Sequence, residues 1–239
     1  MGAVEVVRLH DWRVSPAEAR DIQSKLAASV SAPEGAIDVN LVAGIDMHSR
    51  QARGMARAAV VVLDYPALTP VELAVAEGEV DMPYIPGLLS FRECPLILAA
   101  CEKIRNTPDL VLVDGQGIAH PRRLGLASHL GLCLDVATIG CAKSILCGTH
   151  MPLEDEAGSY AELREHGELV GAAVRTRLGV KPLYVSVGHK IDLSTAIDCV
   201  MRCCRGRRLP EPTRVAHLAA GGQLSLEGIG RSTTTKEHV

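Results

Sequence analysis

The chain has 239 residues, of which 47% are hydrophobic and 22% are charged, so it is long enough to bury the core of one large domain. Its net charge of −3 excludes a general positive field that would attract nucleic acid, so a polyanion would have to be bound by a local site. The eight cysteines form no Cys-x-x-Cys pair, and the helical spacing of Cys199 and Cys203 predicts core packing more than a zinc site. No run approaches the roughly 18 apolar residues of a membrane span. These features predict a cytoplasmic protein that does not enter membranes.

The first half of the chain alternates helical and extended patterns. Ser15 as N-cap, Pro16 at the first helical position and Glu18 two positions later form a capping box, which predicts a helix start. "LVAGID" (41–46) predicts a buried strand, and residues 56–80 predict two further strands in an antiparallel meander. "GLLSFRECPLILAACEKI" (87–104) has helical spacing, with Pro95 as a point of kinking.

The second half continues with strands and helices in alternation. Strands are predicted within 109–114, 136–144, 167–177 and 182–189, and helices within 123–135 and 192–204. Alternation after an antiparallel start indicates a mixed α/β sheet with helices on its faces. We expect one catalytic domain over residues 1–225 and a flexible polar tail over residues 226–239.

Three acidic residues are candidates for a metal site. Asp46 and Asp114 each follow an apolar strand run, and the C-terminal edge of such strands is where open α/β sheets bind ligands. Two aspartates on adjacent strands would offer the oxygen ligands that Mg²⁺ prefers. Each aspartate alone is more simply explained as the cap of a turn. Their combination with Glu93 and a Gly-x-Gly loop favours the metal site.

The loop "DGQGIAHPRR" (114–123) is a second candidate site. Its glycines allow the backbone to approach a ligand, and His120 and two arginines follow. The loop lacks the full dinucleotide or P-loop signature, so it gives only weak support for a nucleotide cofactor. A plain turn explains it equally well.

Three further polar residues lie near predicted strand or helix ends. His189 follows the strand "PLYVSV" and Gly188, and a lone histidine in that position is more often structural. We expect His189 and Lys143 at the same sheet edge as Asp46 and Asp114. Lys143 could place a positive charge there, although a surface lysine is the default interpretation. Asp192 is most simply the N-cap of the next helix. Clustered acids at such an edge match a nuclease-like plan, in which metal-held carboxylates position a phosphodiester and activate water.

The segment "DMPYIPGLLSFRECP" (81–95) contains a stiff tip. Proline fixes φ and lacks a backbone donor, so Pro83 and Pro86 should hold Tyr84 and Ile85 extended. The chain has only four tyrosines, one tryptophan and one phenylalanine, so a rigidly presented aromatic residue is unusual here.

Several segments together closely resemble the endonuclease V family. In chain order, over about residues 38–220, they are "VAGID", "PYIPGLLSFRE", "LVLVDGQGIAHPRRLGLASHLG", "GCAKS", "GAAVRTRLGVKPLYVSVGHKIDL" and "RLPEPTRVAH". The second and third of these segments are the most specific. The resemblance implies an RNase H-like fold. It also implies a monomeric enzyme, dependent on Mg²⁺ or its substitute Mn²⁺, that cleaves DNA at the second phosphodiester on the 3′ side of deoxyinosine.

The resemblance also implies roles for individual residues. Asp46, Glu93 and Asp114 would be the acidic, metal-binding triad, with His189 and Lys143 as further catalytic residues. Tyr84 would be a wedge that fills the space left when the damaged base leaves the stack. The positions expected to contact substrate are Pro83, Tyr84, Ile85, Gly87, Leu89, Gly115, Gly117, His120, Arg122 and Gly125.

Two alternatives to a DNA enzyme remain open at this point. One is a ribonuclease of the same mechanism acting on inosine-containing single-stranded RNA. The other is a non-catalytic protein that binds inosine-containing strands. The intact acidic set argues against the second alternative, because binding a polyanion does not require clustered carboxylates.

Overall fold

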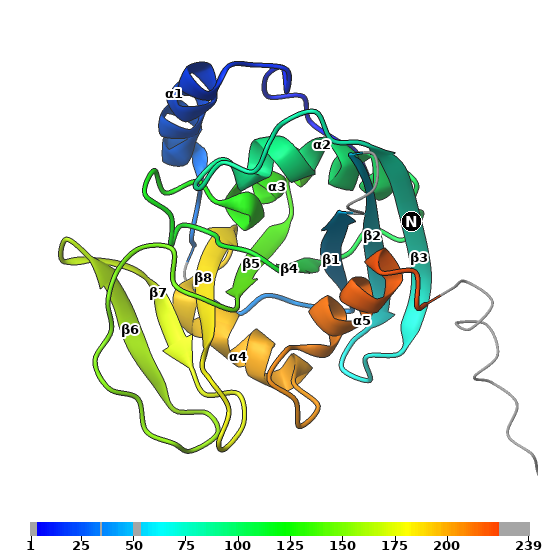
Figure 1. Cartoon of the computed structure of the whole chain (residues 1–239). Helices are drawn as coiled ribbons and strands as arrows, with labels where there is room; N and C mark the ends of the chain where they lie inside the picture. The colour runs from blue at the N-terminus through cyan, green and yellow to red at the C-terminus, as the bar shows by residue number, and fades with distance from the viewer. Residues whose placement is uncertain (1–3, 34, 50–53, 225–239) are drawn as a thin grey trace, which may run out of the picture.

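The computed structural model describes residues 4–33, 35–49 and 54–224. The tail predicted over residues 226–239 lies outside this part of the chain. The strands form one eight-stranded sheet. Figure 1 shows helices packed against this sheet. The elements are α1 (Pro16–Leu26), a short 3₁₀ helix (Ala27–Ser29), β1 (Leu41–Ser49), β2 (Met55–Asp64), β3 (Pro70–Glu79), α2 (Leu89–Cys101), β4 (Leu110–Val113), α3 (Leu126–Leu134), β5 (Ala137–Ala142), β6 (Tyr160–Glu165), β7 (Glu168–Val174), β8 (Leu183–His189), α4 (Leu193–Cys203) and α5 (Glu211–Ala220).

The sheet is mixed, in the order β3-β2-β1-β4-β5-β8-β7-β6. Strands β1, β2 and β3 form the expected antiparallel meander, and β1, β4 and β5 are parallel to one another. The next strand, β8, runs antiparallel to β5, and β6 and β7 continue antiparallel. The parallel part of the sheet is therefore limited to its centre, where β1 and β4 lie side by side.

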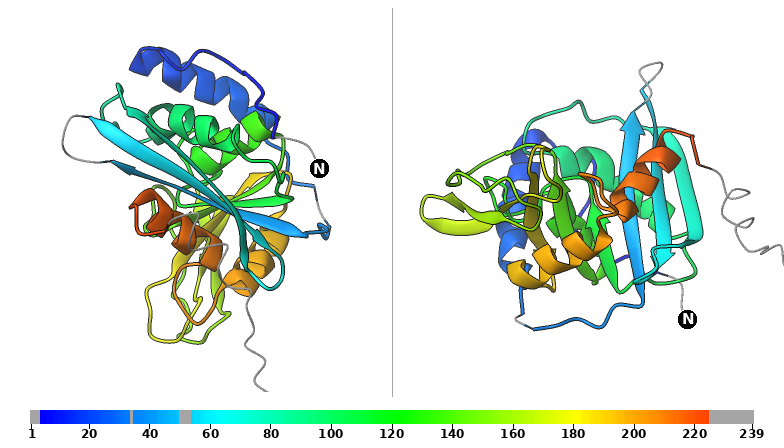
Figure 2. Two further views of the ribbon diagram at one scale, coloured as in Figure 1. Left: turned by 90° about the vertical axis from the view of Figure 1, so that its right-hand side faces the viewer. Right: turned by 90° about the horizontal axis from the view of Figure 1, so that it is seen from below.

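Helices cover both faces of the sheet, as predicted (Figure 2). One core contains side chains of α4 and α5 together with Val42 of β1, and the other contains side chains of α2 and α3 together with Ala43 and Ile45. Alternate residues of β1 thus enter opposite cores, as the two-residue period of a strand requires. Helix α1 adds an outer layer, where Ala19 packs with Leu88 and Phe91.

Several local predictions are confirmed. The hydroxyl of Ser15 accepts from the Glu18 amide, and the Glu18 carboxylate accepts from the Ser15 amide, which completes the capping box. Asp192 caps α4 through the Thr195 amide. Cys199 and Cys203 are buried in the α4 core, and all eight cysteines are free thiols. None of the helices in the described ranges has the length and apolar character needed to cross a bilayer.

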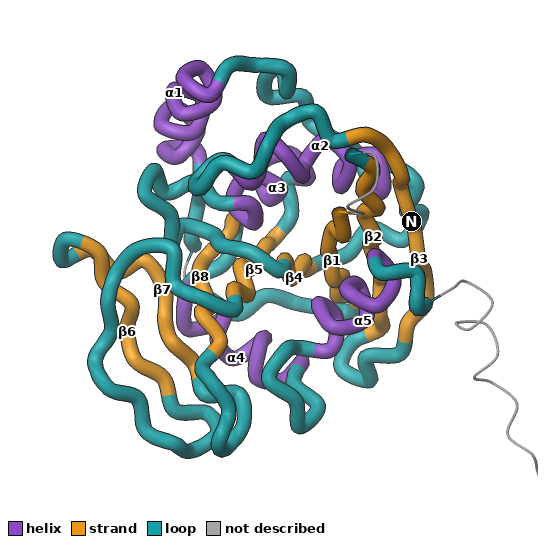
Figure 3. Tube along the Cα trace, viewed as in Figure 1, coloured by secondary structure: helices purple, strands orange, loops and turns teal. Residues whose placement is uncertain are grey.

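Two elements were not predicted from the sequence: strand β6 and helix α5. Figure 3 shows α5 lying close to β1 and β2 on one face of the sheet. Gly44 of β1 makes this contact close, because a Cβ atom at that position would lie 1.8 Å from the Pro212 carbonyl oxygen. A glycine inside an otherwise apolar strand often marks such a backbone approach.

Candidate active site

Asp46 and Asp114 lie next to each other on the two central parallel strands. Ile45 of β1 is paired with Val113 of β4, so the residues that follow them, Asp46 and Asp114, share one level of the sheet. Strand β1 does not end at Asp46 as expected from its sequence; it continues to Ser49, paired with β2. Asp114 is the first residue after β4. The pairing register therefore places the two carboxyl groups together.

His217 of α5 completes a three-residue group with these aspartates. Its Nδ1 atom lies 2.7 Å from Asp46 Oδ2, and one ligand atom from each of the three side chains lies within 4.8 Å of the others. The close approach of α5 to Gly44 brings His217 to this position. The segment "RLPEPTRVAH" ends on His217, but its sequence carries no local sign of metal or substrate binding, so sequence reasoning did not select this histidine.

Glu93 approaches the aspartates from α2, on the other face of the sheet. Burial raises the pKa of its carboxyl to about 8, and the negative charges of Asp46 and Asp114 add to this effect, while Arg92 opposes it. The charges of the two aspartates therefore reach the carboxyl of Glu93. Glu93 is not part of the group whose atoms lie within 4.8 Å of one another.

The charges around Asp46 act in opposite directions. Burial is the largest influence and raises the pKa of Asp46, and the nearby Asp114 raises it further. The hydrogen bond and charge of His217 lower the same pKa. Lys143, which follows β5, forms an ion pair with Asp114 Oδ2. This half-buried acidic group thus has two basic side chains as neighbours, one on each aspartate.

A cavity of about 360 Å³ opens beside the acidic group. Asp114 and Lys143 belong to its lining, so the cavity and the acidic group share residues. Six of the positions expected to contact substrate also line it: Tyr84, Gly87, Leu89, Gly115, His120 and Gly125. The lining further includes residues that sequence reasoning missed: Gln23, Ser90, Gln116, Leu126, Ala142, Ser144, Ile145 and Leu146.

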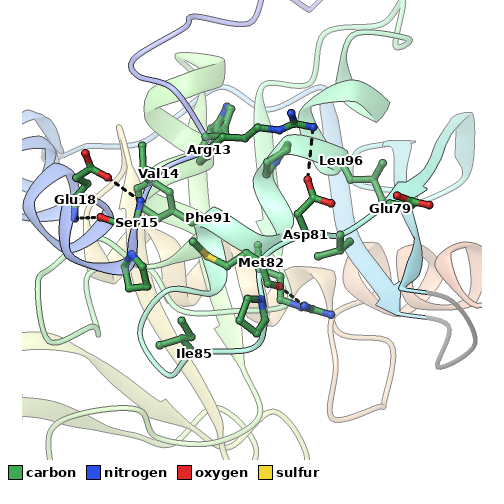
Figure 4. A pocket seen from close by; sticks show the side chains of 16 residues that line it. Arg13, Val14, Ser15, Glu18, Glu79, Asp81, Met82, Ile85, Phe91 and Leu96 are labelled. Atoms are coloured by element: carbon green, nitrogen blue, oxygen red, sulfur yellow. Dashed lines mark hydrogen bonds and ion pairs between the residues drawn. The ribbon is translucent and has the colours of Figure 1, made fainter.

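Tyr84 is exposed at the tip of the loop before α2, with 68% of its surface accessible. Its neighbours Pro83 and Ile85 line a different, larger groove of about 800 Å³, between this loop and the N-terminal segment (Figure 4). Arg92 donates to the Met82 carbonyl, and the Leu88 amide donates to the Ile85 carbonyl. The loop tip is therefore held by these two hydrogen bonds, and it lies between the cavity beside Asp114 and this larger groove.

The carbonyl oxygen of Gly87 is the meeting point of three side chains. It accepts from Arg122 at 2.8 Å, lies 3.0 Å from the His120 ring and accepts from Gln23 at 3.1 Å. The Arg122 guanidinium also donates to Gln23 Oε1 at 2.7 Å. Arg122 therefore fastens the loop and does not line the cavity. Burial lowers the pKa of His120 to about 4, so its ring is neutral at pH 7.

Gly117 supports the site by packing. A Cβ atom there would lie 1.9 Å from the Val187 carbonyl oxygen, and Gly117 does not line the cavity. Its amide donates to Ser186 Oγ at 2.8 Å. The glycine allows the loop after β4 to lie directly on β8, so its contribution to a bound ligand would be indirect.

The expectation that His189 lies at the same sheet edge as Asp114 is wrong. Because β8 is antiparallel to β5, His189 is paired with Thr138 near the beginning of β5, whereas Lys143 follows the end of that strand. The His189 ring accepts from the Ser31 amide at 3.2 Å and lies 3.9 Å from Asp135. His217, and not His189, supplies the imidazole of the acidic site.

Comparison with known proteins gives a consistent result. The family model described as Endonuclease V matches residues 22–218. Endonuclease V of Dehalococcoides mccartyi strain BAV1 is 56% identical over 217 residues, which cover 91% of this chain and 97% of that protein. Endonuclease V of Gloeobacter violaceus is 53% identical over 215 residues, covering 87% of this chain and 86% of that protein.

Solved structures are similar over the same range. Endonuclease V of Streptomyces avermitilis superimposes with a TM-score of 0.84 at 40% identity, covering 92% of this chain and 96% of that one. Endonuclease V of Ciona intestinalis, solved with a 24mer DNA that contains an inosine followed by a ribo-adenosine, has a TM-score of 0.75 at 29% identity. It covers 89% of this chain and 98% of that one.

Proposed function

Since this chain belongs to the endonuclease V family and is therefore a phosphodiester-hydrolysing endonuclease, we propose that it cleaves DNA next to deoxyinosine, the product of adenine deamination. The bond hydrolysed would be the second phosphodiester on the 3′ side of the lesion. The observation that carries this proposal is the position of Asp114, which belongs both to the acidic group and to the lining of the adjacent cavity. A base held in the cavity would place its own strand beside the carboxylates.

The acidic group fits a divalent cation. Two carboxylates and an imidazole within 4.8 Å of one another provide hard oxygen donors and one nitrogen donor, a set suited to Mg²⁺ or Mn²⁺. Asp46 and Asp114 would hold the cation, and Glu93 would complete its surroundings directly or through water. When bound, the cation supplies positive charge to the scissile phosphate and lowers the pKa of water.

The basic residues of the site have separate tasks in this proposal. The Lys143 ammonium, paired with Asp114, lies where it can balance negative charge that develops on the phosphate. His217 is half-exposed, and its contact with Asp46 can hold that carboxylate in one orientation. Glu93 lies in the field of the two aspartates on the opposite face of the sheet, and their charges add to the raised pKa of its carboxyl.

The cavity and the loop tip suit an extruded base. Gly87, Gly115 and Gly125 line the cavity without side chains, and the volume of about 360 Å³ is at the lower end of small-molecule sites. Tyr84 borders the same cavity, so its ring can occupy the space that the base leaves in the duplex. A rigid aromatic tip reduces the entropy lost when the strand is opened.

A second candidate substrate is inosine-containing single-stranded RNA. The observation in its favour is that the Ciona intestinalis protein was solved with a strand in which a ribonucleotide follows the inosine. The same acidic group and cavity would serve either substrate. The two differ in the need for Tyr84, because a single strand has no partner strand to be opened.

One set of oligonucleotides tests these alternatives. Duplex and single-stranded DNA and single-stranded RNA, each with one inosine and each with an adenine control, are incubated with Mg²⁺, Mn²⁺ or EDTA. We expect DNA cleavage at the second 3′ bond with either metal and none with EDTA. Preferential RNA cleavage would favour the second candidate. Binding without cleavage in any metal would contradict both.

Matched variants connect the activity to the site. Asp46→Ala should abolish cleavage, whereas Asp198→Asn, an exposed carboxylate on α4, should leave it unchanged. Equal activity of the two variants would remove the acidic group from the mechanism.

A further inference from the structure

The backbone of Lys143 lies just beyond the last hydrogen-bonded pair of strands β5 and β8. The last residue of β5, Ala142, is paired with Tyr184 of β8, and the chain then leaves the sheet. The next two carbonyl groups are bonded by side chains from two other segments. Arg208 donates to the Lys143 carbonyl at 2.7 Å, and Gln116 Nε2 donates to the Ser144 carbonyl at 2.8 Å.

Arg208 joins three parts of the protein. The nitrogen that bonds the Lys143 carbonyl also donates to the Pro182 carbonyl at 2.7 Å, immediately before β8. The carbonyl of Arg208 itself accepts from the Thr176 hydroxyl at 2.8 Å, after β7. The loop between α4 and α5 is thereby attached to the ends of β5, β7 and β8.

The position of Arg208 has a cost. Its Nε atom is buried and has no hydrogen-bond partner within the described residues. A buried donor without a partner is unfavourable, so this placement does not maximise hydrogen bonding. The placement does let the charged guanidinium join two carbonyl groups, those of Lys143 and Pro182, and the first belongs to the lysine that contacts Asp114.

The anchoring matters because a lysine side chain is flexible. The Lys143 side chain is 43% exposed, and its four-carbon stem lets the ammonium sample many positions in solvent. Fixing the backbone from which it projects keeps the start of the side chain at a place from which the ammonium reaches Asp114. Gln116 fixes the following carbonyl from the loop after β4, the same loop that contains Asp114.

We propose that Arg208 is a positioning residue for Lys143, holding the end of β5 so that the lysine ammonium stays against Asp114. Arg208 is itself a member of neither the acidic group nor the cavity lining, and it acts through the carbonyl of Lys143. The effect on cleavage rests on the proposed function, in which Lys143 balances charge on the phosphate. The effect on the lysine itself does not depend on it.

Arg205 provides a matched control in the same loop. It too donates from one nitrogen to two carbonyls, of Pro66 and Ala67, at 2.9 and 3.0 Å, but these lie in the β2–β3 connection. In single-turnover cleavage with excess enzyme, Arg208→Met should be slower by about tenfold or more with nearly unchanged substrate affinity. Arg205→Met should stay within about twofold of the parent, and Arg208→Lys should recover part of the lost rate.

A double-variant cycle separates positioning from general stability. If Arg208 acts through Lys143, adding Arg208→Met to Lys143→Met should cause no further loss of rate. An additional tenfold loss in that background would mean that Arg208 acts independently of the lysine, and would overturn the inference.

Lysine labelling in metal-free protein provides a readout without activity. The acetylation rate of Lys143, followed by peptide mass spectrometry, should rise several-fold in Arg208→Met because the ammonium leaves Asp114 more often. Lys190 is an internal reference, since its side chain is 40% exposed and its ammonium lies 2.6 Å from Asp135. Its labelling should not change.

The outcomes distinguish the two proposals. Equal labelling of Lys143 in Arg208→Met and Arg205→Met would refute the positioning role even if the parent enzyme cleaves inosine substrates. Increased labelling in a protein that cleaves none of them would leave the positioning role and refute the proposed function. If Arg208→Met does not fold, Arg208→Lys and Gln116→Met carry the same comparison, since each weakens one of the two anchors.

Discussion

The imidazole of His217 and the carboxylate of Asp46 are in direct contact, with 2.7 Å between Nδ1 and Oδ2, although 171 residues separate them in the chain. The contact joins α5 to β1 across a spacing that only a glycine at position 44 allows. It makes the histidine part of the acidic site, and it sets the first of four predictions.

His217→Ala should slow single-turnover cleavage by ~10²-fold or more with little change in substrate affinity, because the group acts on proton transfer or on the orientation of Asp46. The comparison is His189→Gln, at the opposite sheet edge, which should retain most of the parent's rate. If instead His189→Gln is the inactive variant, our assignment of the histidine is reversed.

Glu93→Gln should stabilise the metal-free protein at pH 7 more than at pH 5. Burial raises the pKa of Glu93 to about 8 from an ordinary value of 4.5, so between these pH values the folded state retains a proton that the unfolded chain has released. Stability therefore falls as pH rises through this window, by up to about 3 kcal/mol at pH 7. The glutamine amide of Glu93→Gln does not titrate, so the variant does not lose this stability as pH rises.

Thermal unfolding in EDTA at both pH values measures the effect of Glu93→Gln. The same variant should lose cleavage in Mg²⁺. A stabilisation that is equal at pH 5 and pH 7 would show that the carboxyl titrates normally.

Tyr84→Ala should leave the unfolding temperature nearly unchanged, because the side chain is exposed and its loss creates no cavity. Binding to inosine duplex DNA should weaken by about 1–3 kcal/mol, the usual value of one stacked base, and binding to single strands should weaken less. Tyr160→Ala, at a 57% exposed tyrosine on β6, is the control. A large loss of stability with normal duplex binding would make the tip purely structural.

His129 should contribute to acid sensitivity. It is buried in α3 between His10, at 2.7 Å, and Ser90, at 3.0 Å, and burial lowers its pKa to about 3. Below about pH 6.5 His129 therefore binds a proton in the unfolded chain but stays neutral in the folded protein. The free energy of unfolding consequently falls as pH decreases. By pH 5 the loss is about 2 kcal/mol.

His129→Gln should reduce this acid dependence in denaturant unfolding between pH 7 and pH 5, while His166→Asn, at a fully solvated histidine, should not. The same slope in both variants would show that other groups cause the acid sensitivity.

The local sequence determined the features that depend on neighbouring residues. The capping box of Ser15 and Glu18, the N-cap Asp192 and the buried Cys199 and Cys203 follow from short spacings, and the structure contains all of them. The apolar runs before Asp46 and Asp114 likewise predicted two strands with carboxylates near their ends. The exposed position of Tyr84 followed from Pro83 and Pro86, each of which lies within two residues of it.

Only the tertiary structure decided which of these residues meet. His189 and His217 both follow apolar segments, and periodicity cannot tell them apart. His189 lies away from the acidic group because β8 runs antiparallel to β5. His217 lies in the group because α5 packs directly against Gly44. The resemblance implied a substrate contact for Arg122, whereas the fold places the Gly87 carbonyl within its reach. Strand direction and helix docking are set by burial of whole faces against one another, which no window of local sequence contains.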